Sequence, residues 1–202
     1  MRTIALVGAP GSGKTDLMKA IIEKEYADDP PCDQCPPKAV GVDSYANEAR
    51  DLGDYEIGLN GGYMANISIA VARYNNERII GNRVKPDLMI TCGTVIESAV
   101  YTAMHFERSL ALKNTDEEKM EEAKRFQGCT SMLAVMFMDM FLYEKAFYLP
   151  TPTKPEDERW VSFERNLQAA FQAYQAPIIP LVVEDFKDRD DLTQKRLVRL
   201  FE

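Results

Sequence analysis

Residues 3–15 read TIALVGAPGSGKT, and this stretch decides the fold. Its first five residues form a short apolar run rich in strand-forming types, which predicts a buried strand. The next eight match the pattern G-x-x-x-x-G-K-[ST] in full, namely Gly8, Ala9, Pro10, Gly11, Ser12, Gly13, Lys14 and Thr15. Residues 13–26 then carry apolar side chains at helical spacing. A strand, a glycine-rich loop and a helix in this order predict a P-loop.

The residue types of this loop suit the phosphates of a nucleotide. Its three glycines remove side chains, so that backbone N–H groups can converge on an anion. The helix that begins near Lys14 adds the positive end of its dipole. We expect Lys14 to reach the β- and γ-phosphates and the Thr15 hydroxyl to ligate Mg²⁺. The loop therefore predicts binding of ATP, or of GTP, together with Mg²⁺.

The composition of the whole chain excludes several classes of protein. A length of 202 residues fits one α/β domain, and the formal net charge of −8 makes non-specific coating of DNA or RNA unexpected. The first apolar run is too short for a signal peptide, and no stretch approaches the length of a membrane span. We expect a cytoplasmic protein, and the sequence leaves its oligomeric state open.

Cys32 and Cys35 form a C-x-x-C pair in a proline-rich segment. A structural zinc site would need two further ligands, and the remaining candidates, His105, Cys92 and Cys129, are not at a suitable spacing. The flanking prolines disfavour a redox pair. We interpret the segment as a surface loop that carries two thiols.

Apolar runs that predict strands alternate with helical patterns along the chain. The predicted strands cover residues 3–7, 39–42, 87–92, 145–149 and 177–183. The predicted helices cover residues 13–26, 64–78, 94–106, 116–144 with Gly128 as a candidate break, 159–174 and 192–201. This alternation predicts an α/β fold with a five-stranded parallel sheet and helices on both faces. Ligands of such sheets bind beyond the carboxyl ends of the strands.

Beyond the loop, the chain resembles the small P-loop kinases related to the ribosylnicotinamide kinase domain, often described as an AAA-type domain of phage and bacterial proteins. Residues 87–106 (DLMITCGTVIESAVYTAMHF) look like the family's third strand and following helix, and residues 145–150 (KAFYLP) like its fourth strand. Residues 156–160 (EDERW) are similar to its acidic-then-arginine lid motif. The resemblance implies a single kinase-type P-loop domain over residues 1–202, with a lid-like loop at residues 151–159.

The chain departs from this family at the end of the third strand. There the family usually has an acidic residue, often followed by arginine, whereas this chain reads TCG at residues 91–93. Glu97 is a candidate for the missing acidic contact to Mg²⁺, and the alternative is a first-turn glutamate favoured by the helix dipole. Asp139 follows the apolar run LAVMFM and is a second candidate for an acidic residue of the Walker B type. Its neighbourhood predicts a helix, however, so we interpret residues 132–140 as core packing.

Two further side chains are candidates for the chemistry of phosphoryl transfer. Asp43 follows the second predicted strand, where a carboxylate can accept the proton of a hydroxyl, and the alternative is a turn or N-cap residue. Arg159 lies in the lid motif, where an arginine can close over the transferring phosphate. Arg73 and Arg78 are interpreted as a solvated face.

Residues 43–62 (DSYANEARDLGDYEIGLNGG) combine polar groups, aromatic rings and glycines. They leave the carboxyl end of the second predicted strand, so we expect them to line the pocket of the phosphate acceptor and to be mobile without it. Tyr45, Tyr55 and Tyr63 flank this side and are candidates for stacking on a ring, although single tyrosines are more often packing residues. A surface excursion without a ligand is the alternative for the segment.

Together these patterns predict a P-loop kinase that transfers the γ-phosphate of ATP to a hydroxyl of a nucleoside- or nucleotide-type acceptor. The acceptor is either free or a 5-hydroxymethylpyrimidine in phage DNA, in which case the protein works in the host cytoplasm. The alternative is a P-loop ATPase or nucleotide switch that acts on a protein partner. It would need a water-positioning residue and a partner surface, which the sequence does not show, and the chain also lacks the N-K-x-D motif of switch GTPases.

Overall fold

Five strands form one parallel sheet, in which the strand that precedes the P-loop is central. The computed structural model describes residues 1–27, 36–45, 51, 56–139, 143–151, 158–173 and 178–201. The strands are β1 (Arg2–Val7), β2 (Ala39–Val42), β3 (Leu88–Cys92), β4 (Lys145–Tyr148) and β5 (Ile178–Pro180). They pair in the order β2-β3-β1-β4-β5, with every pair parallel. The predicted five-stranded parallel sheet is confirmed.

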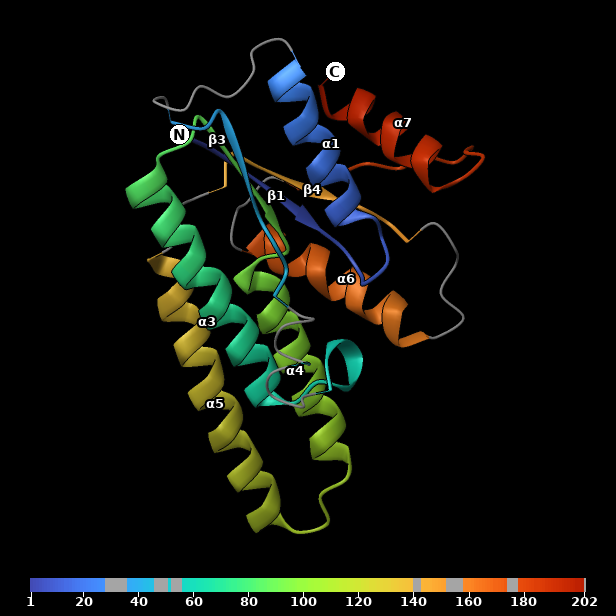
Figure 1. The fold of residues 1–202 in the computed structure, drawn as a ribbon. Helices are drawn as coiled ribbons and strands as arrows, with labels where there is room; N and C mark the ends of the chain where they lie inside the picture. Colours follow the sequence, from blue (N-terminus) through green and yellow to red (C-terminus); the bar gives the residue numbers. More distant parts are fainter. Residues whose placement is uncertain are drawn as a thin grey trace.

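Helices cover both faces of this sheet (Figure 1). One face carries α1 (Lys14–Ala27) and α7 (Arg189–Phe201), and the other carries α4 (Val95–Ala111) and α6 (Glu158–Ala173). Two more helices, α3 (Tyr63–Ile79) and α5 (Asp116–Met138), pack against α4 and extend beyond the sheet as a bundle. A 3₁₀ turn, η1 (Gly58–Asn60), precedes α3, and a π-helical turn, η2 (Ile80–Val84), follows it.

The alternation of side chains along β1 divides the core into two layers. Ile4 and Leu6 pack with α1 and α7, whereas Ala5 and Val7 pack with α4 and α6. All four are buried, as expected for a central strand of a parallel sheet that is covered on both faces.

Helix α5 differs from its prediction in two ways. It runs without a break through Gly128 and ends at Met138. Its apolar run is core only in part: Leu133 is buried with Met136 and Phe137 packed beside it, but Met132, Val135 and Met138 are exposed, the last at 77%. The prediction of core packing is therefore wrong for Met132, Val135 and Met138, which lie on the side of α5 away from α3 and α4, the described helices that it packs against. Asp139 caps this helix and bonds to the side chains of Tyr74 and Arg78 on α3, away from the strand ends.

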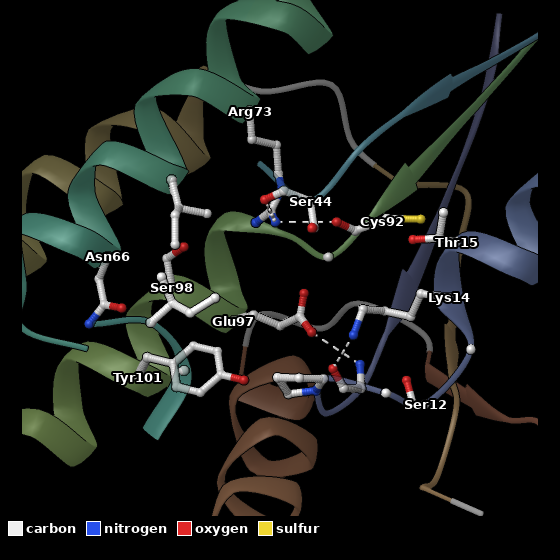
Figure 2. Close-up of a pocket in the computed structure, with 18 of the residues that line it drawn as sticks. Ser12, Lys14, Thr15, Ser44, Asn66, Arg73, Cys92, Glu97, Ser98 and Tyr101 are labelled. Atoms are coloured by element: carbon white, nitrogen blue, oxygen red, sulfur yellow. Dashed lines mark hydrogen bonds between the residues drawn. The ribbon is translucent and has the colours of Figure 1, made fainter. Parts of the chain in front are cut away.

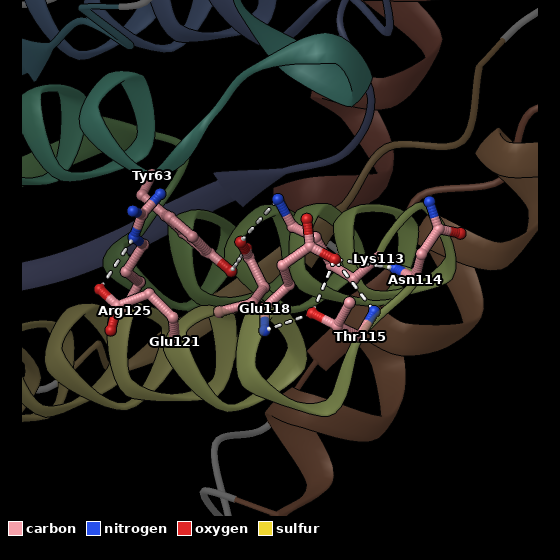
Figure 3. A network of polar contacts seen from close by, with 8 residues as sticks. Tyr63, Lys113, Asn114, Thr115, Glu118, Glu121 and Arg125 are labelled. Carbon is pink, nitrogen blue, oxygen red and sulfur yellow. Dashed lines mark hydrogen bonds and ion pairs between the residues drawn. The ribbon is translucent and has the colours of Figure 1, made fainter.

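Two features at the ends of elements complete the fold. Polar contacts close the far end of the bundle, where the Tyr63 hydroxyl donates to Glu122 of α5 at 2.6 Å and Thr115 forms a capping box with Glu118 (Figure 3). The last strand is shorter than the predicted residues 177–183: β5 is an edge strand over Ile178–Pro180, and one further hydrogen bond, from Leu181 N–H to Tyr148 O, follows it. Within the described ranges, none of the helices is long and apolar enough to cross a membrane.

Removing the Phe163 ring should destabilise the protein through the layer between α4 and α6. Phe163 of α6 is completely buried and stacks on Tyr101 of α4 with 4.5 Å between ring centroids. We expect Phe163→Ala to lower the free energy of unfolding by about 3–5 kcal/mol, because the cavity it leaves can collapse only in part. The matched control is Val161→Ala on the exposed face of the same helix, with a change within about 0.5 kcal/mol in denaturant titrations. Equal losses in the two variants would contradict this assignment of the core.

Candidate active site

The loop between β1 and α1 has the backbone of a phosphate nest. Gly8, Gly11 and Gly13 have φ angles of 147°, 81° and 90°, in the region that favours glycine. Space is also restricted at Gly8, where a Cβ atom would lie 2.4 Å from the carbonyl oxygen of Leu149, just after β4. Any larger residue at position 8 would therefore push the loop away from the sheet. The local geometry explains why the sequence needs glycine here.

A buried arginine from the last helix holds this loop from behind. Arg196 of α7 is 2% exposed, and its guanidinium donates to the carbonyl oxygens of Ser12 and Pro150. Burial lowers the pKa of Arg196 to about 10. Sequence reasoning missed this residue, because a single arginine in an amphipathic helix reads as a surface charge. Its contacts join the P-loop to the segment after β4.

The Lys14 ammonium lies within the loop and faces an acidic group. It donates to the carbonyl oxygens of Gly8 and Ala9. Burial lowers the pKa of Lys14, while the nearby Glu97 carboxylate acts in the opposite direction. The cation that the sequence predicts for the phosphates is thus held where the backbone N–H groups of the loop converge.

Glu97 is the carboxylate that joins the P-loop to α4. Its Oε2 accepts the Thr94 N–H at 2.7 Å, and the Thr94 hydroxyl accepts the Glu97 N–H, so the two residues form a capping box. Its Oε1 accepts the Gly8 N–H at 3.0 Å. Glu97 does lie in the first turn of α4, as the alternative expected, and the same side chain also contacts the P-loop, so its predicted contact to Mg²⁺ stays a prediction. Each carboxylate oxygen retains lone pairs for a further partner.

The end of β3 has room for two charged groups because position 93 is glycine. Gly93 has a φ of 85°, and a Cβ atom on it would lie 2.4 Å from Glu97 Oε2 and 2.7 Å from Arg73 Nη2. A carboxylate from α4 and a guanidinium from α3 therefore meet at the strand end that lacks an acidic residue of its own.

Arg73 is not solvated, and its interpretation as part of a solvated face is wrong. It is 4% exposed, and its guanidinium donates to Thr94 O at 2.7 Å, Ser44 O at 3.0 Å and Cys92 O at 3.2 Å. These carbonyls lie after β2, at the end of β3 and at the start of α4. One side chain thus holds three segments of the site in register.

A second buried carboxylate lies behind Arg73. Glu77 is completely buried, with the Thr91 hydroxyl 2.8 Å from its Oε1 and the Tyr143 hydroxyl at 3.4 Å. Burial raises the pKa of Glu77 to about 7, against the opposing effects of the Thr91 hydrogen bond and the Arg73 charge. The i, i+4 spacing of Arg73 and Glu77 resembles an exposed helical ion pair, which is why the sequence gave no signal of burial.

These elements enclose a cavity of about 270 Å³ beyond the carboxyl ends of β1, β2 and β3. The P-loop forms one wall, and α3, α4 and η1 form the opposite wall. In Figure 2, Asn66 and Tyr101 lie across the cavity from Lys14 and Thr15, and Glu97 lies between them. Its described lining includes Lys14, Thr15, Ser44, Ile57, Asn66, Ile69, Arg73, Glu97, Ser98, Tyr101 and Arg189.

Of the residues predicted from the sequence, Lys14, Thr15 and Glu97 line this cavity together. Asp43 lies at its edge: it is exposed, its Oδ1 accepts the N–H of Ser44 at 2.6 Å, and Ser44 itself lines the cavity. Arg159 is the second residue of α6, and it donates to Asn60 Oδ1 of η1 at 3.4 Å, outside the described lining.

Several predictions fall on residues that the structure does not describe. They are Cys32, Cys35, Tyr55 and most of the lid-like loop, residues 152–157. The predicted acceptor segment is described only in part, and Ser44, Ile57 and Gly58 are the members of it that line the cavity. Tyr63 lies at the start of α3, bonded to Glu122.

A P-loop after the central strand of a sheet ordered β2-β3-β1-β4-β5 defines the P-loop NTPase fold of the kinase type. Two similar solved structures are of NadR, a ribosylnicotinamide kinase, one in complex with NR (TM-score 0.66, 12% identity) and one with NAD and AMP-PNP (TM-score 0.66, 13% identity). The two matches cover 99% and 98% of this chain. This chain therefore spans about half the length of the NadR chains, 51% of the first and 49% of the second.

Thymidylate kinases share the fold over nearly their full length. The enzyme from Ehrlichia chaffeensis matches with a TM-score of 0.57 and 10% identity, over 100% of this chain and 98% of its own. The enzyme from Candida albicans matches with a TM-score of 0.55 and 11% identity, over 99% of this chain and 90% of its own. No protein-family model and no curated protein matches the sequence. These likenesses show the fold.

Replacing Glu77 with Gln should remove a pH dependence of stability. The folded chain binds the Glu77 proton more tightly than the unfolded chain, because the pKa is raised from 4.5 to about 7. The resulting contribution to the free energy of unfolding is fully present below pH 4.5 and is lost as the pH rises through about 7. It amounts to roughly 3 kcal/mol. Denaturant titrations at about pH 5 and about pH 8 should therefore show a larger decline for the natural chain than for Glu77→Gln.

Glu107→Gln provides the control, since Glu107 is an exposed glutamate on α4. It should keep the decline of the natural chain. If Glu77→Gln declines as steeply as this control, Glu77 does not titrate as its burial implies.

Proposed function

We propose that this protein is a kinase that transfers the γ-phosphate of ATP to a hydroxyl group of a nucleoside- or nucleotide-type acceptor, with Mg²⁺, in the cytoplasm. The observation that carries the proposal is the shared cavity, in which a phosphate-binding loop faces a separate wall of polar and apolar side chains. Two substrates have to meet in one enclosed space for direct transfer. The kinase-type fold of NadR and the thymidylate kinases supports it.

The P-loop side of the cavity fits a nucleotide and its metal ion. Lys14 and the N–H groups of the nest suit the phosphates, and the Thr15 hydroxyl and the Glu97 carboxylate supply the hard oxygen ligands that Mg²⁺ prefers. When bound, Mg²⁺ neutralises charge on the phosphate oxygens. Because Glu97 is already held by the N–H groups of Gly8 and Thr94, the P-loop side of the cavity needs little rearrangement to bind the nucleotide.

On the acceptor side, a hydroxyl oxygen attacks the γ-phosphorus while the bond to the β–γ bridging oxygen breaks, which releases ADP. Asp43 accepts the hydroxyl proton as general base. It lies next to Ser44, whose carbonyl oxygen accepts a hydrogen bond from Arg73. Arg159, at the start of α6, stabilises the charge of the transferring group once the lid-like segment closes. The acceptor is a free molecule or a 5-hydroxymethylpyrimidine in phage DNA.

Radiolabelled ATP offered with nucleosides, nucleotides and hydroxymethylated DNA tests the reaction. We expect label on an acceptor, and we expect Lys14→Ala to abolish it, because the variant lacks the cation at the phosphate nest. Lys19→Ala, an exposed position on the same helix, should retain full transfer. Release of free phosphate alone, stimulated by a protein partner, would contradict the proposal and indicate the ATPase or switch. Full transfer by Lys14→Ala would contradict the assignment of the site.

Asp43→Asn separates the general base from nucleotide binding. Turnover should fall by roughly 10²–10⁴-fold, the usual contribution of a positioned base, while the affinity for ATP stays nearly constant. Asp87→Asn is the matched control, because Asp87 is an exposed carboxylate at the opposite end of the sheet. Unchanged turnover in Asp43→Asn would remove Asp43 from the mechanism and leave Glu97 as the candidate base.

A further inference from the structure

A buried cation contacts the P-loop on the side away from the cavity. Arg196 of α7 is 2% exposed, and its guanidinium donates to the carbonyl oxygens of Ser12 in the P-loop and Pro150 after β4. Two such contacts fix the planar guanidinium, and a Cβ atom on Gly13 would lie 3.4 Å from its Nη1. The described residues that line the cavity include Ser12 and Gly13 but not Arg196. The guanidinium therefore lies behind the loop, against the Ser12–Gly13 peptide.

The direction of the Ser12 carbonyl determines the direction of the Gly13 N–H. These two groups belong to one peptide unit, and in a trans peptide they point in opposite directions. No peptide bond within the described ranges is cis. Because the carbonyl points at Arg196, the Gly13 N–H points away from Arg196, toward the side where the loop lines the cavity. This is the side on which the phosphates of the proposed nucleotide bind.

The charge of Arg196 makes this N–H a stronger hydrogen-bond donor. A hydrogen bond from a cation to a carbonyl polarises the peptide, and linked hydrogen bonds strengthen one another inside a protein. Both described partners of the guanidinium are neutral carbonyls, and burial lowers the pKa of Arg196 only to about 10, so it is charged at neutral pH. Water screens a buried charge weakly. An anion on the other side of the peptide is therefore stabilised by it.

Helix α7 is held in place by contacts that do not involve the Arg196 guanidinium. It packs beside α1 (Figure 1), with Leu197 in the core layer that the two helices share. In its first turn, Arg189 forms an ion pair of 2.6 Å with Asp16 of α1. A neutral side chain of similar length at position 196 should therefore leave the helix in place, and buried charges can often be replaced by apolar groups at little cost in stability.

We infer that Arg196 is a positioning residue for nucleotide binding: it orients the Ser12–Gly13 peptide and strengthens the Gly13 N–H as a donor to the phosphates, without touching them. The inference rests on the proposed binding of a nucleotide at the P-loop and deepens it. It gives α7 a part in phosphate affinity that is separate from the charge of Lys14, which lies inside the loop.

Calorimetric titrations of the full chain with ADP and with inorganic pyrophosphate, both with Mg²⁺, test the role of this charge. Arg196→Met keeps a side chain of similar length without the cation, so the Kd of both ligands should rise roughly 10–100-fold. Arg196→Lys keeps a charge and one donor and should bind within about 5-fold of the natural chain. Arg199→Met, the control, removes an exposed cation from the same helix and should change either Kd by less than about 2-fold, because solvent screens that charge.

The melting temperature without ligand separates this role from a purely structural one. Arg196→Met should melt within about 3 °C of the natural chain, because α7 keeps its other contacts. A much lower melting temperature, or binding by Arg196→Lys as weak as that of Arg196→Met, would indicate a structural brace and overturn the inference.

Two other outcomes separate the inference from the proposed function. Natural affinity for ADP and pyrophosphate in Arg196→Met would overturn the inference and leave the nucleotide site intact. If the natural chain showed no binding of ADP that depends on Lys14, the nucleotide site and the inference would both be wrong. If it bound ADP in this way but labelled no acceptor from radiolabelled ATP, only the kinase function would be contradicted.

Discussion

The hydrogen bond from the Gly8 N–H to the Glu97 carboxylate is the contact on which the arrangement of the site depends. It connects the first residue of the P-loop with the first turn of α4, two parts of the chain that are 89 residues apart. The other carboxylate oxygen caps α4. Glu97 is 5% exposed, and at such depth a carboxylate needs its full set of partners. The bond therefore sets the distance between the two walls of the cavity.

Charged side chains of the opposite sign surround this buried carboxylate. Lys14 and Arg73 approach it from the loop and from α3, and Gly93 leaves the space in which they meet. Arg73 in turn faces Glu77 behind it. Alternating charges of this kind stabilise one another in a buried region, whereas removing one member leaves another without a partner. The same network holds the ends of β2 and β3 at the cavity, so that the wall opposite the P-loop is shaped by contacts made largely outside it.

The fold and the P-loop side of the cavity could be predicted because their signals are local. A complete P-loop pattern follows an apolar strand, and short buried strands alternate with helical patterns, so that neighbouring residues alone indicate the sheet. Arg73, Glu77 and Arg196 could not be predicted, because each is buried by segments distant in sequence. Local spacing did not predict the exposure of Met132, Val135 and Met138 at the end of α5, because it does not show which side of the helix faces α3 and α4. Gly93 carried a weak signal, since a glycine directly after a strand often marks a close approach.

In the proposed reaction, nucleotide and acceptor meet in this one cavity, on opposite sides of Glu97. The sharpest test is a crystal structure of the full chain with Mg²⁺, a non-hydrolysable ATP analogue and the acceptor that it phosphorylates. We expect the γ-phosphate analogue at Lys14 and the P-loop backbone, with the acceptor against the wall formed by α3 and α4 and its reactive hydroxyl facing the γ-phosphorus. A nucleotide bound away from the P-loop, or an acceptor bound outside the wall formed by α3 and α4, would contradict it.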